Sequence, residues 1–268
     1  MIEKNGIELL QFELLQKLGL FHFSTTIQGG VSKEAYSSFN LSLYSGDDIQ
    51  HVIANRLRLA DAAGVSIERL LIPYQTHEDK ILAIDEVFLS LSNEEQLLQL
   101  NGIDALITNR KGVCIGVTTA DCVPILLFDP EKKVLAAIHA GWKGTVQRIA
   151  AKAVSEMTGR YGCNPQHILA GIAPSISPEI FEVGDEVGKA FTDNGFDLSS
   201  ISFRNQQTGK LHINLWEANR LQLVDAGLLS ENIEVAGLCT YKDPDLFFSA
   251  RRQTIHSGRM VTGGVITD

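Results

Sequence analysis

Two residues that can bind a metal ion or transfer a proton lie at the ends of neighbouring apolar segments. Cys122 directly precedes the apolar segment 123–128, and His139 directly follows the apolar segment 134–138. Both segments have the length and the Val, Ile, Leu and Phe content of buried strands. A turn that contains a proline at 129–133 allows them to pair antiparallel. We therefore expect Cys122 and His139 at the same edge of a sheet, where they can share a metal ion or a proton.

His77 is the third candidate, at the end of the polar segment 74–77. With Cys122 and His139 it would form a His2Cys set, and imidazole nitrogen and thiolate sulfur are ligands that suit zinc or copper. Three protein ligands leave the fourth position open for water or substrate, which is typical of catalytic rather than structural zinc sites. The spacing of the three residues matches no zinc-finger signature.

Cys122 and His139 also fit a different chemistry, in which a thiolate nucleophile is activated by a neighbouring base. That pair would need a third, orienting group, which the sequence does not identify. Asp121 points to the opposite face if the strand has already begun there, so we interpret it as a turn residue or a residue that supports the ligands, rather than as a ligand. A metal-binding or sensing protein without turnover is a further alternative. The remaining cysteines are expected to be buried small apolar side chains: Cys114, Cys163 and Cys239.

Two helices are expected on either side of these segments along the chain. The apolar spacing predicts one over Ile49–Ala63, with an aspartate at 47 or 48 as its N-cap and a glycine after it. The second is expected over residues 145–157, with Thr145 as its N-cap and one apolar face. The side chains of the first helix that we expect to face the core are Val52, Ile53, Leu57 and Leu59.

Composition indicates an ordinary globular protein. The chain has 268 residues, of which 44% are hydrophobic and 21% charged, and residues 1–268 are expected to form one domain of mixed helix and strand. A net charge of −9 without a basic run argues against nucleic acid as a partner. The sequence has no apolar stretch of membrane-spanning length and no signal-peptide pattern, which predicts a cytoplasmic protein with reduced cysteines. Without a repeating apolar seam, we expect a monomer or a weak homodimer.

The motifs TADCVPILLFDP and AIHAGWKGT, with QTH upstream, resemble those of the YfiH/YlmD-like family, also called the laccase-domain or polyphenol-oxidase-like family. The resemblance continues through HFSTTIQGGVS, APSISPEIFEVG and SGRM and extends over nearly the whole chain. It implies an α+β fold, with mixed sheets flanked by helices in αββα layers. It also implies a metal site at His77, Cys122 and His139 and a ligand-binding arginine at Arg56. By itself, Arg56 on its predicted helix has the appearance of a solvated side chain.

The resemblance implies zinc-dependent purine nucleoside chemistry. The expected reactions are phosphorolysis of adenosine, inosine and methylthioadenosine to the free base and a (methylthio)ribose 1-phosphate, and deamination of adenosine. Arg56 would hold the phosphate, and zinc would polarise a ligand oxygen. The alternative is copper-dependent oxidation of phenols, although the chain has seven histidines and no HxH motif of the kind that multicopper laccases use. A Cys–His hydrolase built on Cys122 and His139 is the third hypothesis.

The chain departs from the family pattern at two places. Relatives usually have arginine where this chain has Thr26, a change expected to weaken anion binding at that loop. Relatives often have cysteines where this chain has Glu179 and Ile180, and this change leaves the expected metal ligands untouched.

Overall fold

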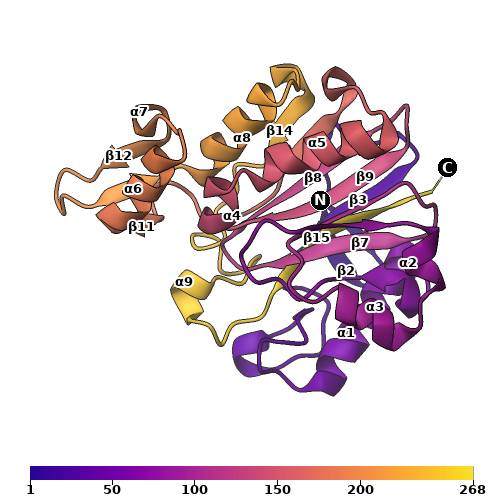
Figure 1. Ribbon diagram of the computed structural model, residues 1–268. Helices are drawn as coiled ribbons and strands as arrows, with labels where there is room; N and C mark the ends of the chain where they lie inside the picture. Colours follow the sequence, from indigo (N-terminus) through magenta and orange to yellow (C-terminus); the bar gives the residue numbers. More distant parts are fainter. Residues whose placement is uncertain (268) are drawn as a thin grey trace.

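Two six-stranded sheets form the centre of the computed structural model, which describes residues 1–267, and helices cover their outer faces (Figure 1). The first sheet joins distant parts of the chain, because the last strand lies between the third and the seventh. In spatial order its strands are β1 (Ile2–Lys4), β2 (Ile7–Leu10), β3 (Leu20–Thr25), β15 (Met260–Ile266), β7 (Cys114–Thr119) and β4 (Leu70–Leu71).

The second sheet has the two segments that flank the candidate site at its centre. Its strands β8 (Val123–Asp129) and β9 (Val134–Ala140) pair antiparallel through the turn at 129–133, as expected from the sequence. In spatial order the strands are β14 (Ile233–Val235), β10 (Leu169–Ile172), β8 (Val123–Asp129), β9 (Val134–Ala140), β6 (Ala105–Thr108) and β5 (Ile81–Ile84).

The helices lie outside the sheets, and a small third sheet lies at one end of the molecule beside α6 (Asp185–Asp193) and α7 (Leu198–Ile201) (Figure 1). The helices are α1 (Ile49–Ala63), α2 (Glu86–Ser90), α3 (Asn93–Gln99), α4 (Trp142–Val146), α5 (Ile149–Tyr161), α6 (Asp185–Asp193), α7 (Leu198–Ile201), α8 (Leu215–Asp225) and α9 (Ala250–Gln253). The third sheet contains β11 (Glu182–Val183), β13 (Leu211–Ile213) and β12 (Ser202–Arg204), in that order.

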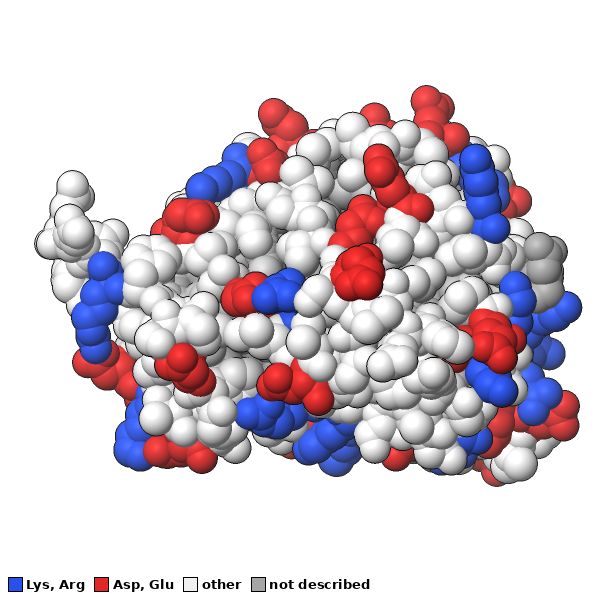
Figure 2. Space-filling view, turned by 90° about the horizontal axis from the view of Figure 1, so that it is seen from above, with Lys and Arg blue, Asp and Glu red and all other residues white. Residues whose placement is uncertain are grey.

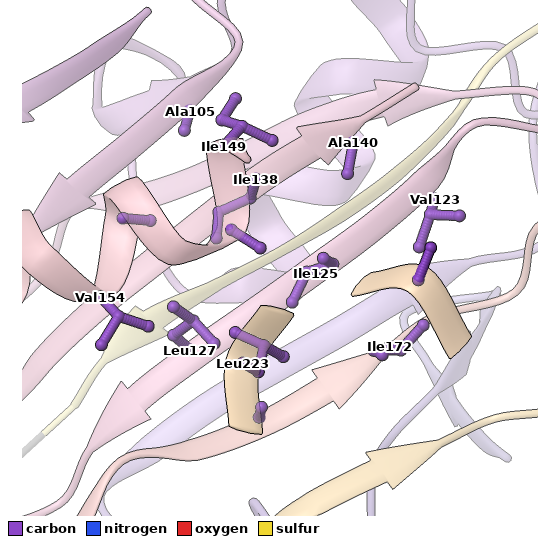
Figure 3. Close-up of a cluster of buried hydrophobic side chains, with 14 of the residues drawn as sticks. Ala105, Val123, Ile125, Leu127, Ile138, Ala140, Ile149, Val154, Ile172 and Leu223 are labelled. Atoms are coloured by element: carbon purple, nitrogen blue, oxygen red, sulfur yellow. The ribbon is translucent and has the colours of Figure 1, made fainter. Parts of the chain in front are cut away.

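The alternating side-chain directions along β8 show how the layers are built. Ile125 and Leu127 point toward α5 and α8, where they meet Leu223 (Figure 3). Leu126 and Phe128 point the other way and pack against the first sheet. Since successive side chains of a strand point to opposite faces, a strand covered on both sides must be apolar throughout, and every residue of β8 is buried. Helix α1 covers the outer face of the first sheet, so the αββα arrangement expected from the sequence is confirmed.

Helix α1 has the predicted bounds, but part of its predicted core face is wrong. Asp48 caps it by accepting a hydrogen bond from Gln50 N. Ile53 and Leu57 are exposed (40% and 49%), whereas Asn55 is buried. The inward stripe repeats at i, i+3 and i+7 from Val52, and Asn55 occupies it because its amide donates to three oxygens of residues 32–40. This stripe places Ile53 and Leu57 on the outer face.

The helix predicted over 145–157 is divided into two. Gly141 is the N-cap of α4, so Thr145 lies inside that helix and the prediction that it is an N-cap is wrong. Arg148 has a positive φ of 61°, which interrupts the helix before α5 begins. The apolar face of the later residues is as predicted, since Ile149, Ala153 and Met157 are buried against the second sheet.

The surface is consistent with the composition. On the face formed by α5 and α8, acidic and basic side chains alternate without a continuous basic patch (Figure 2). In residues 1–267, each helix is too short or too polar to cross a membrane.

Candidate metal centre and its cavity

The pairing of β8 with β9 brings Cys122 and His139 together. In the register of the two strands Pro124 lies opposite His139, and Val123 lies opposite Ala140. Cys122 directly precedes β8 and therefore lies at the same sheet edge as His139. This confirms the placement expected from the sequence.

His77 reaches the site from a loop that a buried carboxylate holds in place. Its backbone has a positive φ of 63°, an uncommon conformation for a residue other than glycine. The backbone N–H groups of His77 and Glu78 donate to the Asp104 carboxylate at 3.0 and 2.9 Å. The loop thus forms a nest of amides around Asp104, and this nest orients His77 toward the other two residues.

Asp104 also orients His139, a role that the sequence did not reveal. Its Oδ1 lies 2.7 Å from His139 Nδ1, and both side chains are buried. The contact leaves Nε2 of His139 for the site, as carboxylate–histidine pairs do around metals. The only local signal was an acidic residue directly before the apolar strand β6, and such a residue is usually a turn residue.

The donor set fits a metal ion. The ligand atoms of His77, Cys122 and His139 all lie within 4.8 Å of one another, and two nitrogens and one sulfur suit zinc or copper. Gly141 leaves the room they need, because a Cβ there would lie 3.1 Å from Cys122 Sγ and 3.3 Å from a carbon of the His77 ring. His139 is buried and His77 is exposed, so the centre is open on the His77 side.

The charges within the cluster favour the thiolate that a metal requires. Burial alone would raise the pKa of Cys122, but the charge of His139 and hydrogen bonds from both histidines outweigh it and lower that pKa. Burial would lower the pKa of His139, but the thiolate and Asp104 raise it. The cluster without metal is therefore best described as a thiolate beside an imidazolium, and a metal ion would displace the proton of His139.

The three residues lie in the wall of a cavity of about 590 Å³. Ser42, Ser45 and two aromatic rings form part of the wall. The rings of Tyr44 and Tyr74 meet edge to face with their centroids 4.4 Å apart. Gln75 joins the His77 loop to β7, because its amide exchanges hydrogen bonds with Thr118. Other lining residues are Asp121, Ile176, Phe181, Arg251, Ile255 and Arg259.

Asp121 is a turn residue, as interpreted from the sequence, and not part of the three-ligand group. It has a positive φ of 89°, and its carboxylate accepts hydrogen bonds from Thr240 (2.7 Å), Ser249 (3.0 Å) and the backbone N–H of Arg251 (2.6 Å). These bonds tie α9 to the segment that carries Cys122. The three remaining cysteines are buried, as expected.

Arg56, the expected ligand-binding arginine, does not line this cavity. Its Nε donates to Leu41 O at 2.8 Å, and its side chain lines a second, mostly apolar cavity of about 290 Å³. The Arg56 side chain therefore lies behind the 41–45 loop as seen from the cavity of the metal ligands. Thr26 is fully buried and accepts a hydrogen bond from Gln28 N, so it does not line the cavity either. Arg259, which does line it, was not predicted as a site residue.

An αββα fold that carries a His2Cys centre at one sheet edge, open to a cavity, defines the class of this protein as one with a candidate catalytic metal site. The family follows from comparison with known proteins. The model of a family described as multi-copper polyphenol oxidoreductase laccase matches residues 21–267, and the chain belongs to this family, which includes the YfiH-like proteins.

Relatives cover almost the whole chain. It is 46% identical over 259 residues to a purine nucleoside phosphorylase of Bacteroides thetaiotaomicron, with 96% of each chain covered. It is also 46% identical over 258 residues to the adenosine deaminase RL5 of an unknown prokaryotic organism, which covers 96% of this chain and 98% of that one. Among solved structures, YlmD from Geobacillus stearothermophilus superposes with a TM-score of 0.90 at 32% identity, over 100% of this chain and 98% of that one.

Proposed function

We propose that this chain is a zinc-dependent purine nucleoside phosphorylase that also deaminates adenosine. Its substrates would be adenosine, inosine and methylthioadenosine together with phosphate. The observation that carries the proposal is the three-ligand centre of His77, Cys122 and His139, open to a cavity of about 590 Å³. The proposal agrees with relatives named purine nucleoside phosphorylase and adenosine deaminase at 46% identity.

The walls of the cavity suit a nucleoside. The rings of Tyr44 and Tyr74 are 59% and 40% exposed and present aromatic surface on which a purine can stack. Because Tyr74 and His77 belong to the same short loop, a base on the tyrosines would hold the rest of the nucleoside beside the metal ligands. The cavity is large enough for a nucleoside and a phosphate ion together.

The two reactions differ in the nucleophile. In phosphorolysis a phosphate oxygen bonds to the anomeric carbon, the glycosidic C–N bond breaks, and the purine nitrogen keeps the electron pair and takes a proton. In deamination water adds to C6 of adenine and ammonia leaves. Bound zinc would supply a Lewis acid that polarises an oxygen of substrate or water. The protein would contribute by holding His139 through Asp104 and by placing the substrate through the tyrosines.

The metal itself distinguishes the alternatives. The description of the matching family favours copper-dependent oxidation of phenols as the second candidate. Residues 1–267 contain a single group of three or more potential ligands, whereas a laccase passes electrons through several coppers. A Cys–His hydrolase would use the thiolate beside His139 without any metal.

The test is one set of incubations with protein of measured metal content. Adenosine is supplied to zinc-loaded, copper-loaded and metal-free protein, with and without phosphate, and products are separated by chromatography. We expect adenine and ribose 1-phosphate only with phosphate and in proportion to bound zinc, and inosine with or without phosphate. If zinc protein forms none of these while copper protein oxidises a phenol, the oxidase replaces the phosphorylase. Full activity of metal-free protein would exclude both metal hypotheses.

A further inference from the structure

Two arginines in the cavity wall have no carboxylate of residues 1–267 in direct ion-pair contact. Within residues 1–267, Arg204 and Arg220 form ion pairs with acidic side chains, but Arg251 and Arg259 form none. Nη1 of Arg259 instead donates to the carbonyl oxygens of Ser257 (2.6 Å) and Gly258 (2.9 Å) and to the Ser257 hydroxyl. These neutral oxygens hold the guanidinium in place, and the Asp121 carboxylate acts on it only from beyond ion-pair distance.

The topology brings Arg259 to the metal-ligand end of the cavity. Arg259 directly precedes β15, whose first residue, Met260, pairs with Thr119 at the end of β7. The chain then continues from Thr119 to Cys122 within three residues, so the turn before β15 and the turn before β8 share one end of the molecule. Arg259 and Cys122 both line the cavity there.

Contacts around Arg259 hold its backbone in a defined position. Its N–H donates to Asn40 Oδ1 at 2.9 Å, and the amide of the same asparagine donates to Ser45 Oγ in the loop that lines the cavity. Gly258 lies against the ring of Phe248, where a Cβ would come within 2.5 Å of a ring carbon. A position held on both sides is what a binding residue needs, since little entropy is lost when a ligand arrives.

The other charged groups in the cavity wall leave room for an anion. Among residues 1–267, Asp121 is the one carboxylate in the wall, and its oxygens already accept three hydrogen bonds from Thr240, Ser249 and the Arg251 backbone. The guanidinium of Arg251 donates to the carbonyl oxygens of Ile180 and Glu182 and lies over the Phe181 ring. Arg259 keeps its charge at neutral pH, because guanidinium groups are protonated in proteins.

We infer that Arg259 binds the attacking phosphate, with Arg251 on the same wall as a second contact. The inference rests on the proposed phosphorylase activity and assigns the anion site to a residue other than Arg56. A guanidinium offers two parallel N–H groups to a phosphate, which both binds and orients it. Phosphorolysis requires such orientation, since the attacking oxygen must face the anomeric carbon while the base lies on the tyrosines.

The first measurement is binding of inorganic phosphate to the zinc-loaded protein by isothermal titration calorimetry. We compare the unchanged protein with Arg259→Lys and Arg259→Gln, and use Arg204→Gln, in the small third sheet, as the matched control. Loss of a charge-assisted contact should weaken phosphate binding about 10- to 100-fold in Arg259→Gln. Arg259→Lys keeps the charge without the planar fork and should lie between the two. Arg204→Gln should match the unchanged protein.

The kinetic measurement tests the same residue in turnover. In phosphorolysis, the KM for phosphate should rise in the Arg259 variants by a larger factor than the KM for adenosine, at equal zinc content. A merely structural role would change both KM values and the zinc content together. If Arg259→Gln does not fold, Arg259→Lys and Arg251→Gln provide the same comparison.

The outcomes separate this inference from the proposed function. Phosphate affinity equal in the unchanged protein and both Arg259 variants overturns the inference, as does the absence of phosphate binding to the unchanged protein. If the unchanged protein binds phosphate through Arg259 but forms no ribose 1-phosphate, the anion site stands and the phosphorylase does not.

Discussion

The metal-ligand side of the cavity and its arginine side are assembled over different distances along the chain. Cys122 and His139 are the ends of one hairpin, so the turn and the two strands bring them together. Arg259 reaches the same cavity only because β15 inserts between β3 and β7 and closes the first sheet. The Cys122–His139 pair follows from local pairing, whereas the arginine side depends on the completed fold. Substitutions on the two sides should therefore impair different properties of the protein.

The largest effect is expected on the metal-ligand side. Cys122→Ser should lower bound zinc and reduce phosphorolysis by a factor of about 1,000 or more, because a catalytic metal supplies several kcal/mol of transition-state stabilisation. Elemental analysis and initial rates measure both effects. Cys163→Ala is the control, since Cys163 is buried away from the centre. This variant should keep its bound zinc. Retention of both zinc and activity by Cys122→Ser would remove Cys122 from the site.

A smaller effect, on zinc affinity, is expected from substitution of Asp104, which orients two of the ligands. Asp104→Asn should weaken zinc affinity about 10- to 100-fold, as substitutions of partners behind metal ligands do. The amide cannot accept from His139 and the His77 loop as the carboxylate does. Competition with a chelator measures the affinity. Asp129→Asn is a matched control, because Asp129 is also buried and accepts two backbone N–H groups but does not contact the centre. Equal zinc affinity in both variants would contradict the role of Asp104.

On the arginine side, a change to the turn should first affect stability. Gly258→Ala would bring a Cβ within 2.5 Å of the Phe248 ring and should cost about 1–3 kcal/mol of unfolding free energy. Thermal unfolding should show this as a lower Tm, with zinc content unchanged. Gly159→Ala is the control, since a Cβ there meets nothing within 4 Å. A lower zinc content in Gly258→Ala would show that the two sides are coupled more closely than their contacts indicate.

The smallest effect is expected from substitution of Arg56, the arginine that the family resemblance implied. Arg56 holds Leu41 O from behind the loop, so Arg56→Gln should raise the KM for phosphate less than Arg259→Gln does. We expect a change of about threefold, because loss of this hydrogen bond would affect the cavity only through the position of the 41–45 loop. Steady-state kinetics with varied phosphate measures it. A larger rise for Arg56→Gln than for Arg259→Gln would return the phosphate site to Arg56.

The elements around the metal ligands could be predicted because their signals are local. Strand β8 is apolar at nearly every position, β9 follows after a proline turn, and His77 ends a polar segment. The core face of α1 could not be predicted in the same way. Asn55 is buried because it donates to oxygens of residues 32–40, and those oxygens are placed by a loop that the helical pattern does not describe.

The sequence by itself determined the apolar strands, the turn between them and the three residues that can hold a metal ion. Hydrophobic periodicity and turn chemistry act between residues close in the chain, so they can be recognised without the fold. Only the tertiary structure decided that Asp104 joins His77 to His139, that Arg56 lies behind the cavity and that Arg259 lines it. These roles depend on which strands are neighbours in a sheet and on which charged side chains have no ion-pair partner once the core has closed.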